Sequence, residues 1–300
     1  MAGSEEIAPV VLFCYNRPEA LRRTLAALAA CRLAAETELY LFVDGPARGE
    51  DREKVLAVRK IAEAAEGFRS VSVQASESNR GLGPSIIAGV SAVLENHPSV
   101  IVMEDDLRVM PDFLQYMNEG LRRYQAEKGV FSVCGYSNAV KAPSGYAFDA
   151  YFCPRSSSWG WGTWQDRWAS VDWQPTRESL RKNACGFNRW GGSDCAKMLR
   201  DWMAGKNKSW AIRFCYSQFL QDKVSVFPVK SLVDPSEGFS GDGTNCKKYS
   251  RFRADLQEDA LAAFRWPEAI SVIPSVRRQA LHYHSLLLRL WSRLMYVWYR

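Results

Sequence analysis

The amino-acid sequence predicts an α/β fold in which helices flank a mainly parallel central sheet. Short apolar runs alternate with longer, charged and alanine-rich runs over the first 127 residues, which is the pattern of strands joined by crossover helices. Proline opens three of the expected helices, at positions 18, 84 and 111, where its missing N–H costs nothing. A chain of 300 residues with 47% hydrophobic content can bury a substantial core.

The first half predicts four strands, each followed by a helix. The expected strands cover residues 9–15, 39–45, 70–74 and 99–103, and the expected helices cover residues 18–30, 51–66, 84–94 and 111–127. The second half differs, with short strands expected between residues 130 and 151 and eight of the eleven tryptophans between Trp159 and Trp210. No repeat or low-complexity linker separates the halves, so we expect one continuous domain.

Charge and cysteine content restrict the function classes. The net charge of +6 suits an anionic small molecule or a membrane surface, but without a Lys/Arg run it does not indicate nucleic acid. Eight cysteines form no Cys-x-x-Cys pair and only three histidines are present, which argues against zinc. We expect reduced cysteines and a cytoplasmic protein, since the N-terminus has no secretory signal and no apolar run is long enough to span a membrane.

The C-terminus, residues 276–300, predicts an amphipathic helix. Arg289, Arg293 and Arg300 fall in one narrow arc, and the opposite face is apolar and aromatic. That face consists of Leu287, Trp291, Leu294 and Trp298. A basic stripe opposite such a face is typical of a helix lying in the plane of a membrane surface. The alternative is a terminal helix that packs on the domain or on a partner subunit.

Polar residues stand at the carboxyl ends of the four expected strands, where parallel sheets bind ligands. Glu104, Asp105 and Asp106 follow the fourth strand. Such carboxylates suit Mg²⁺ or Mn²⁺ and a diphosphate, although a solvated acidic turn before a helix is the alternative. Asp44 can accept from a pyrimidine ring or ribose, or can simply belong to a turn. Arg17 can meet a base or phosphate, or be an exposed residue at a helix start.

The segment Asn79-Arg80-Gly81-Leu82-Gly83-Pro84 can bring backbone N–H groups and Arg80 toward phosphates at a helix start. It is neither a Walker loop nor a dinucleotide fingerprint, and a plain strand-to-helix turn is the alternative.

Together, "VVLFCYNRPEALRRTLAAL", "LYLFVDGP", "NRGLGPSIIAGV" and "VIVMEDDLRVMPDFL" resemble the nucleotide-sugar-binding half of GT-A-fold glycosyltransferases. They are most similar to bacterial family-2-type enzymes and to the N-acetylglucosaminyltransferase I type. The resemblance implies that Asp106 binds the metal, that Glu104 and Asp105 contact the donor sugar and ribose, and that Asp44 holds uracil with Arg17 nearby. It also implies a nucleotide-sugar-binding half at residues 1–128 and an acceptor-binding, catalytic half at residues 129–275.

The second half is then expected to bind the acceptor and supply a base. Asp194, after two glycines and a serine at a helix start, is the favoured base, and Asp201, two helical turns on, is the alternative. Asp194 can also be only a helix cap. Trp159 and Trp161 can stack on sugar rings or belong to the core.

Two further segments are candidates for the site. Trp210 and Arg213 can lie near it or merely begin an amphipathic helix. Asp242 belongs to a glycine-rich stretch, residues 237–248, with the composition of a lid over the donor, or of a disordered loop.

The sequence therefore predicts a metal-dependent glycosyltransferase of bacterial cell-surface glycan synthesis. It would move one sugar from a UDP-sugar, with inversion, to a hydroxyl of a glycan or lipid-linked acceptor, using Mn²⁺ or Mg²⁺. We expect it in the cytoplasm, peripherally attached to the inner membrane. No Gln-x-x-Arg-Trp motif is present, which argues against a processive synthase. The alternatives are a sugar nucleotidyltransferase and a non-catalytic, membrane-docked carbohydrate-binding protein.

Overall fold

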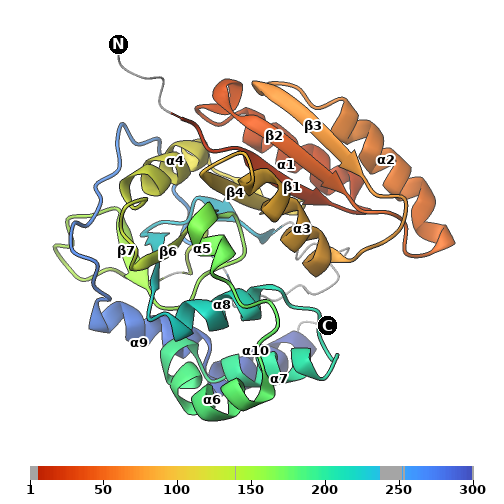
Figure 1. The fold of residues 1–300 in the computed structure, drawn as a ribbon. Coiled ribbons are helices and arrows are strands. Elements are labelled where there is room, and N and C mark those ends of the chain that lie inside the picture. Colours follow the sequence, from red (N-terminus) through yellow and green to blue (C-terminus); the bar gives the residue numbers. More distant parts are fainter. Residues whose placement is uncertain (1–5, 139, 237–251, 253, 299–300) are drawn as a thin grey trace.

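The computed structural model describes residues 6–138, 140–236, 252 and 254–298, and one eight-stranded sheet runs through both halves of the chain (Figure 1). Its strand order is β3-β2-β1-β4-β8-β6-β9-β7. The strands are β1 (Val10–Cys14), β2 (Glu38–Val43), β3 (Ser70–Ala75), β4 (Ser99–Glu104), β6 (Val130–Cys134), β7 (Ala150–Cys153), β8 (Trp161–Trp164) and β9 (Val224–Pro228). Two short strands, β5 (Arg108–Val109) and β10 (Val233–Asp234), pair with each other.

Ten α-helices surround this sheet in the described part of the chain. They are α1 (Pro18–Ala29), α2 (Arg52–Glu63), α3 (Leu82–Leu94), α4 (Phe113–Arg123), α5 (Gln165–Ala169), α6 (Arg177–Gly191), α7 (Cys195–Met203), α8 (Ala211–Leu220), α9 (Pro274–Tyr283) and α10 (Leu286–Trp298). Helices α6, α7, α9 and α10 form a layer at one end of the molecule, away from β1, β2 and β3 (Figure 1).

The predicted parallel sheet is confirmed in the first half. Strand β1 pairs in parallel with both β2 and β4, and β2 pairs in parallel with β3. The second half adds antiparallel pairs, because β8 runs opposite to β4 and β6, and β7 runs opposite to β9. No helix separates β6, β7 and β8 along the chain, so these strands lack the crossovers that parallel pairing needs. The sheet as a whole is therefore mixed.

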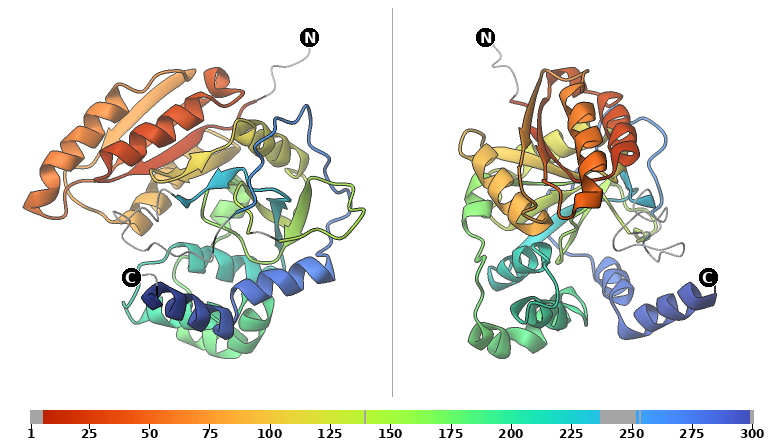
Figure 2. Two further views of the ribbon diagram at one scale, coloured as in Figure 1. Left: turned by 180° about the vertical axis from the view of Figure 1, so that it is seen from behind. Right: turned by 90° about the vertical axis from the view of Figure 1, so that its right-hand side faces the viewer.

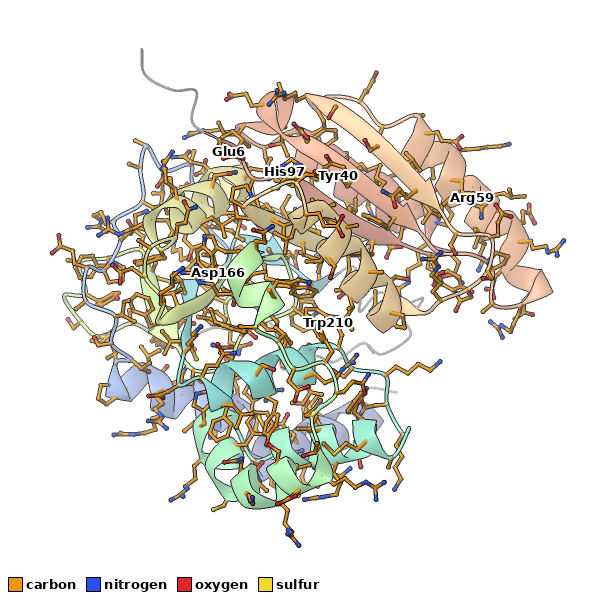
Figure 3. The ribbon with its side chains drawn as sticks, in the orientation of Figure 1. Glu6, Tyr40, Arg59, His97, Asp166 and Trp210 are labelled. Carbon is orange, nitrogen blue, oxygen red and sulfur yellow. The ribbon has the colours of Figure 1, made fainter. Side chains whose placement is uncertain are left out.

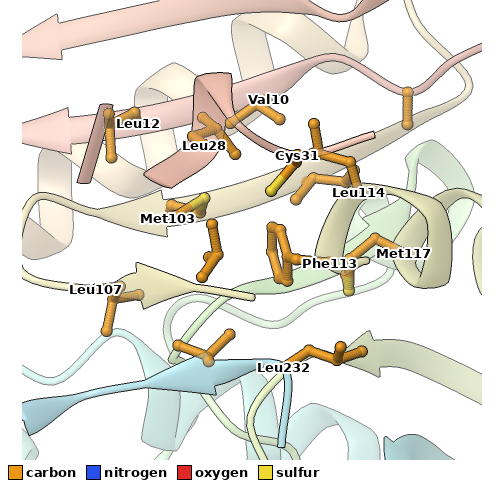
Figure 4. Close-up of a cluster of buried hydrophobic side chains, with 14 of the residues drawn as sticks. Val10, Leu12, Leu28, Cys31, Met103, Leu107, Phe113, Leu114, Met117 and Leu232 are labelled. Atoms are coloured by element: carbon orange, nitrogen blue, oxygen red, sulfur yellow. The ribbon is translucent and has the colours of Figure 1, made fainter. Parts of the chain in front are cut away.

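Strand β1 is apolar on both of its faces because helices cover both sides of the sheet. Its side chains Val10 and Leu12 enter one hydrophobic cluster, which Figure 4 shows, while Val11 and Phe13 enter another. Helices α1 and α2 cover the first face and α3 covers the second (Figure 2). The continuous apolar run that predicted this strand is thus a consequence of burial from both sides.

Two helix starts differ from the prediction. Pro18 lies in the first turn of α1 as expected. Helix α3 begins at Leu82, after Gly81 with a φ of 78°, so Pro84 is its third residue. Helix α4 begins at Phe113, so Pro111 lies in the preceding turn. In each case proline still stands where a backbone N–H has no helical partner.

The predicted C-terminal helix is interrupted. Helix α9 ends at Tyr283 and α10 begins at Leu286, and the Ser285 hydroxyl accepts from the Leu288 N–H at 3.3 Å. Serine at this position satisfies a free donor at a helix start, which favours a new helix over a continuous one. Arg300 and the side chains of Arg293 and Trp298 lie outside the described residues. Within the described part, no helix is long and apolar enough to cross a bilayer.

Candidate active site

A cavity of about 520 Å³ lies at the carboxyl ends of β1, β2 and β4 and against the start of α3. Its polar lining includes five residues that the sequence singled out. They are Arg17, Asp44, Arg80, Glu104 and Asp105. The rings of Phe13 and Phe42 add an apolar side and stack with their centroids 5.3 Å apart. Arginines, carboxylates and an apolar surface thus share one cavity.

The acidic triplet follows β4, where each acid has a different environment. Asp105 is buried, and its Oδ2 accepts from the Tyr15 N–H at 3.0 Å. Asp106 pairs with Arg17, with Nη1 and Oδ2 2.6 Å apart, and about a fifth of each side chain is exposed. Glu104 is half-buried and lines the cavity. Asp106 is therefore the acid held by a cation at the edge of the site.

The triplet carries more negative charge than Arg17 offsets. Burial, together with Asp106 and Asp105, raises the pKa of Glu104 to about 8. Burial and then Asp106 raise the pKa of Asp105 to about 7, while Arg17 acts in the opposite direction. A divalent cation beside these oxygens would stabilise their ionised forms, so the donor set fits a hard metal ion.

No group of three metal-ligating side chains is assembled among the described residues. A site built on one or two carboxylates suits Mg²⁺ or Mn²⁺, which usually keep water and substrate phosphates as further ligands. Any metal here would therefore depend on the diphosphate for part of its coordination.

Asp44 holds the turn before α3. Its carboxylate accepts from the Gly45 and Arg80 N–H groups at 2.9 and 2.8 Å, and from the Asn79 amide and the Gly81 N–H at 3.0 and 2.9 Å. Two carboxylate oxygens offer about four acceptor positions, and these four donors use them. The arrangement favours the turn role over the uracil contact that the resemblance implies, and sequence reasoning missed Asn79 as a partner.

Asp194 is buried at the start of α7. Its Oδ1 accepts from Arg155 Nη1 at 2.9 Å, and its Oδ2 lies 3.9 Å from His284 Nδ1. Asp194 is the N-cap residue of α7, but its side chain makes no capping hydrogen bond to that helix. Burial favours the neutral acid, but Arg155 and then His284 outweigh it and lower the pKa of Asp194. The carboxylate is therefore held ionised.

Asp201 has a more open position on the same helix. It forms an ion pair with Lys197, one turn earlier, and a quarter of its side chain is exposed. That geometry is a solvated pair on a helix surface. It favours Asp194 over Asp201 as the base.

Trp161 and Trp210 belong to the core. Their rings stack with centroids 5.0 Å apart, and both side chains are buried. Trp210 lies between α8 and α3 (Figure 3), where its Cβ is 3.8 Å from the position of a Cβ added to Gly83. Neither tryptophan lines one of the two larger cavities. The core-packing alternative therefore describes both.

Arg213 is buried among tryptophans as well. Its Nη1 donates to the Trp173 carbonyl at 2.9 Å, and its guanidinium lies 4.6 Å from the Trp202 ring centroid. It lines neither cavity. Its contacts therefore join elements of the second half and do not face a ligand cavity. Asp242 lies outside the described residues.

A second cavity, of about 240 Å³, lies in the second half. Trp159 lines it, together with Arg155 and His284. Both of these last two residues contact Asp194, so the favoured base stands just behind the cavity wall. Sequence reasoning missed Arg155 and His284, and the only signal was that Arg155 precedes the serine run of residues 156–158.

Comparison with known proteins gives one family and several distant structures. The model of the family described as "Glycosyltransferase like family 2" matches residues 8–167. No curated protein matches the sequence.

The solved structures are similar at low identity. TarS of S. aureus is 12% identical with a TM-score of 0.42, over 75% of this chain and 36% of TarS, or 59% of TarS 1–349. A mannosyltransferase of Pyrobaculum calidifontis, solved with GDP-Man and Mn²⁺, is 13% identical with a TM-score of 0.39, over 72% of this chain and 77% of that one. This chain thus spans well under two thirds of TarS.

Proposed function

Because the chain belongs to the glycosyltransferase-like family 2, we propose that it transfers a single sugar from a UDP-sugar to a hydroxyl of a glycan or lipid-linked acceptor. The proposal rests chiefly on the 520 Å³ cavity, in which two arginines and three carboxylates face an apolar side. A nucleoside diphosphate has the matching parts, namely a flat base and a dianionic diphosphate.

The donor would lie along this cavity. The stacked rings of Phe13 and Phe42 offer an apolar surface for uracil. Arg17 and Arg80 line the same space, and arginine pairs well with phosphate oxygens. Glu104 and Asp105 would then face the sugar and ribose hydroxyls.

Mn²⁺ or Mg²⁺ would be held by Asp106, with the donor phosphates completing its coordination. When bound, such an ion neutralises the charge that develops on the leaving diphosphate. Asp106 now pairs with Arg17, so a metal at Asp106 would leave the Arg17 guanidinium able to contact a phosphate.

Asp194 would act as the base. It takes the proton of the acceptor hydroxyl while that oxygen forms a bond to the anomeric carbon, and the bond from this carbon to the diphosphate oxygen breaks to release UDP. Attack from the face opposite the leaving group inverts the configuration. The lowered pKa of Asp194 keeps its carboxylate ionised, which is the form that a base must have before it takes a proton.

The reaction would take place at the cytoplasmic face of the bacterial inner membrane, where surface polysaccharides are built on lipid carriers. Helix α10 supports this setting, because Leu287, Trp291 and Leu294 are 79%, 54% and 66% exposed. An exposed apolar helix face next to arginine suits a membrane surface.

The test measures release of UDP from a panel of UDP-sugars with Mn²⁺, with Mg²⁺ or with EDTA. We expect metal-dependent release, reduced about 100-fold by Asp106→Asn, which removes one charge-stabilising group. The exposed Asp259 supplies a matched control, since Asp259→Asn makes the same change away from the cavity.

Metal-independent release that Asp106→Asn leaves intact would overturn the metal assignment. Release of pyrophosphate in place of UDP would identify a nucleotidyltransferase. Turnover of only GDP- or dTDP-sugars would correct the nucleotide.

A further inference from the structure

The 240 Å³ cavity has a wall from the C-terminal part of the chain. Arg277, Ala280 and Leu281 of α9 line it, and so does His284, which follows the helix. These residues are spaced three or four apart, so they share one face of the helix. The opposite side includes Arg155 and the serines at positions 156–158. Helix α9 thus forms one wall of this cavity, which agrees with the alternative that the C-terminal part packs on the domain.

The charges around this cavity are positive. Its lining contains two arginines and a histidine and, among the described residues, no aspartate or glutamate. Arg155 is compensated by Asp194. Arg277 is not, because no carboxylate of the described chain pairs with it and its one hydrogen bond goes to the Arg189 carbonyl at 3.4 Å. The charge of Arg277 also reaches the Cys153 thiol, which lines the same cavity.

The wall of the second cavity contacts the start of α3, which also lines the proposed donor cavity. Gly83, at the start of α3, approaches the Lys208 carbonyl and the Trp210 side chain so closely that an added Cβ would lie 2.9 Å from that oxygen. Leu82 lines the donor cavity, whereas Ser209 and Ala211 line the second one. The segment 208–211 therefore packs against the start of α3 and also contributes Ser209 and Ala211 to the lining of the second cavity.

We propose that the second cavity binds an anionic group of the acceptor, a phosphate or a carboxylate, through Arg277. This inference rests on the proposed function and narrows its acceptor to an acidic one. Guanidinium recognises both anions with paired, charge-assisted hydrogen bonds. Ligand pockets for larger molecules usually begin at about 300 Å³, so this cavity suits one sugar or one charged group rather than a whole glycan. The Trp159 ring offers a face for the sugar that carries the charge.

The experiment uses three soluble probes that share one sugar ring: glucose 1-phosphate, methyl glucuronide and neutral methyl glucoside. Each is titrated into the full chain in the presence of UDP and Mn²⁺, so that the donor cavity is occupied, and binding is followed by tryptophan fluorescence. UDP itself is titrated first. The variants are Arg277→Gln, Arg277→Lys and, as a matched control, Arg278→Gln, since Arg278 is also exposed but does not line the cavity.

At least one anionic probe is expected to bind more tightly than methyl glucoside. Arg277→Gln should weaken it about 10-fold, the loss expected for one charge-assisted hydrogen bond, while Arg277→Lys and Arg278→Gln retain most of it. Preference for glucose 1-phosphate indicates a lipid phosphate, and preference for the glucuronide indicates an acidic saccharide. Equal binding of all probes, or equal loss in both glutamine variants, would overturn the inference. The UDP titration alone decides the donor proposal, so the two failures are distinguishable.

Discussion

Arg155 determines the charge state of the favoured base. Asp194 is buried, which on its own would raise its pKa, and the nearby Arg155 and His284 reverse that direction. Because its folded-state pKa is below the ordinary value of 3.8, Asp194 stabilises the fold at pH values above that value. This stabilisation is lost as the pH falls through the folded-state pKa.

Arg155→Gln should therefore raise the pKa of Asp194, since burial would no longer be opposed by the nearest cation. We expect the acidic limb of the kcat–pH profile to move to higher pH, while Arg155→Lys moves it less. The control is Arg200→Gln, because Arg200 is an exposed residue of α7, the helix that Asp194 begins. A profile unchanged in Arg155→Gln, with activity intact, would contradict a catalytic role for Asp194.

The sequence could indicate the polar residues of the donor cavity because they follow directly on strands. Arg17, Asp44 and Glu104 come just after apolar runs, and parallel strands bring such positions together. The pairing of Arg155 with Asp194 could not be predicted, because 39 residues separate them and no sequence motif contains both. The sequence could not decide between core packing and sugar stacking for the tryptophans either. Whether Trp161 is buried depends on neighbours that are distant in the sequence.

Among the elements, α3 packs closely on the sheet at Gly89. A Cβ added at Gly89 would lie 2.9 Å from the Phe13 ring and 3.1 Å from Phe42. These two rings form the apolar side of the donor cavity. The glycine therefore lets the helix approach without displacing the surface on which a base would rest.

Gly89→Ala should lower the free energy of unfolding by about 1–3 kcal/mol, because overpacking forces rings or backbone to shift. It should also weaken UDP binding, since Phe13 and Phe42 would move. Gly49→Ala is the control, as an added Cβ at Gly49 meets nothing within 4 Å. Denaturant unfolding and UDP titration of both variants measure the effect. Equal stability of the two variants would show that α3 can move away freely.

The strands and helices of the first half were predictable because each is long, apolar on a regular period and bounded by turn residues. The antiparallel pairing of β8 with β4 was not predictable, because a strand of four residues does not indicate which strand it pairs with. The break between α9 and α10 was also missed, because apolar and basic residues continue across it and only Ser285 marks the new start.

At the scale of the whole molecule, the chain is one sheet with helices on both faces, and the GT-A fold implied by the resemblance is confirmed by the family match and the mixed α/β architecture. Strand β4, which carries the acidic triplet, pairs directly with β8 of the second half. Main-chain hydrogen bonds between β4 and β8 therefore join the two proposed halves in one sheet.

Among the described residues, helix α10 carries five of the eight exposed large hydrophobic side chains. We expect the protein to bind vesicles of equal parts phosphatidylglycerol and phosphatidylcholine, and added salt to weaken binding by screening the arginines. Replacing Leu287 and Trp291 together by serine should reduce binding at least about 10-fold, given the apolar area withdrawn.

Leu56→Ser serves as the control in that sedimentation assay. Leu56 on α2 is 54% exposed, the same as Trp291, and α2 is well separated from α10 (Figure 1). If the double variant sediments with vesicles as well as Leu56→Ser does, α10 does not dock on the membrane, and its apolar face must serve another contact.

The four hydrogen bonds of Asp44 have a consequence for the thermodynamics of donor binding. They fix Asn79, Arg80 and Gly81 in the protein without any nucleotide, so the conformational entropy of this turn is lost when the chain folds. A nucleotide that enters the cavity then meets an ordered wall and does not have to order it. Association at this wall should resemble the docking of two rigid surfaces, with a small entropic penalty from the backbone.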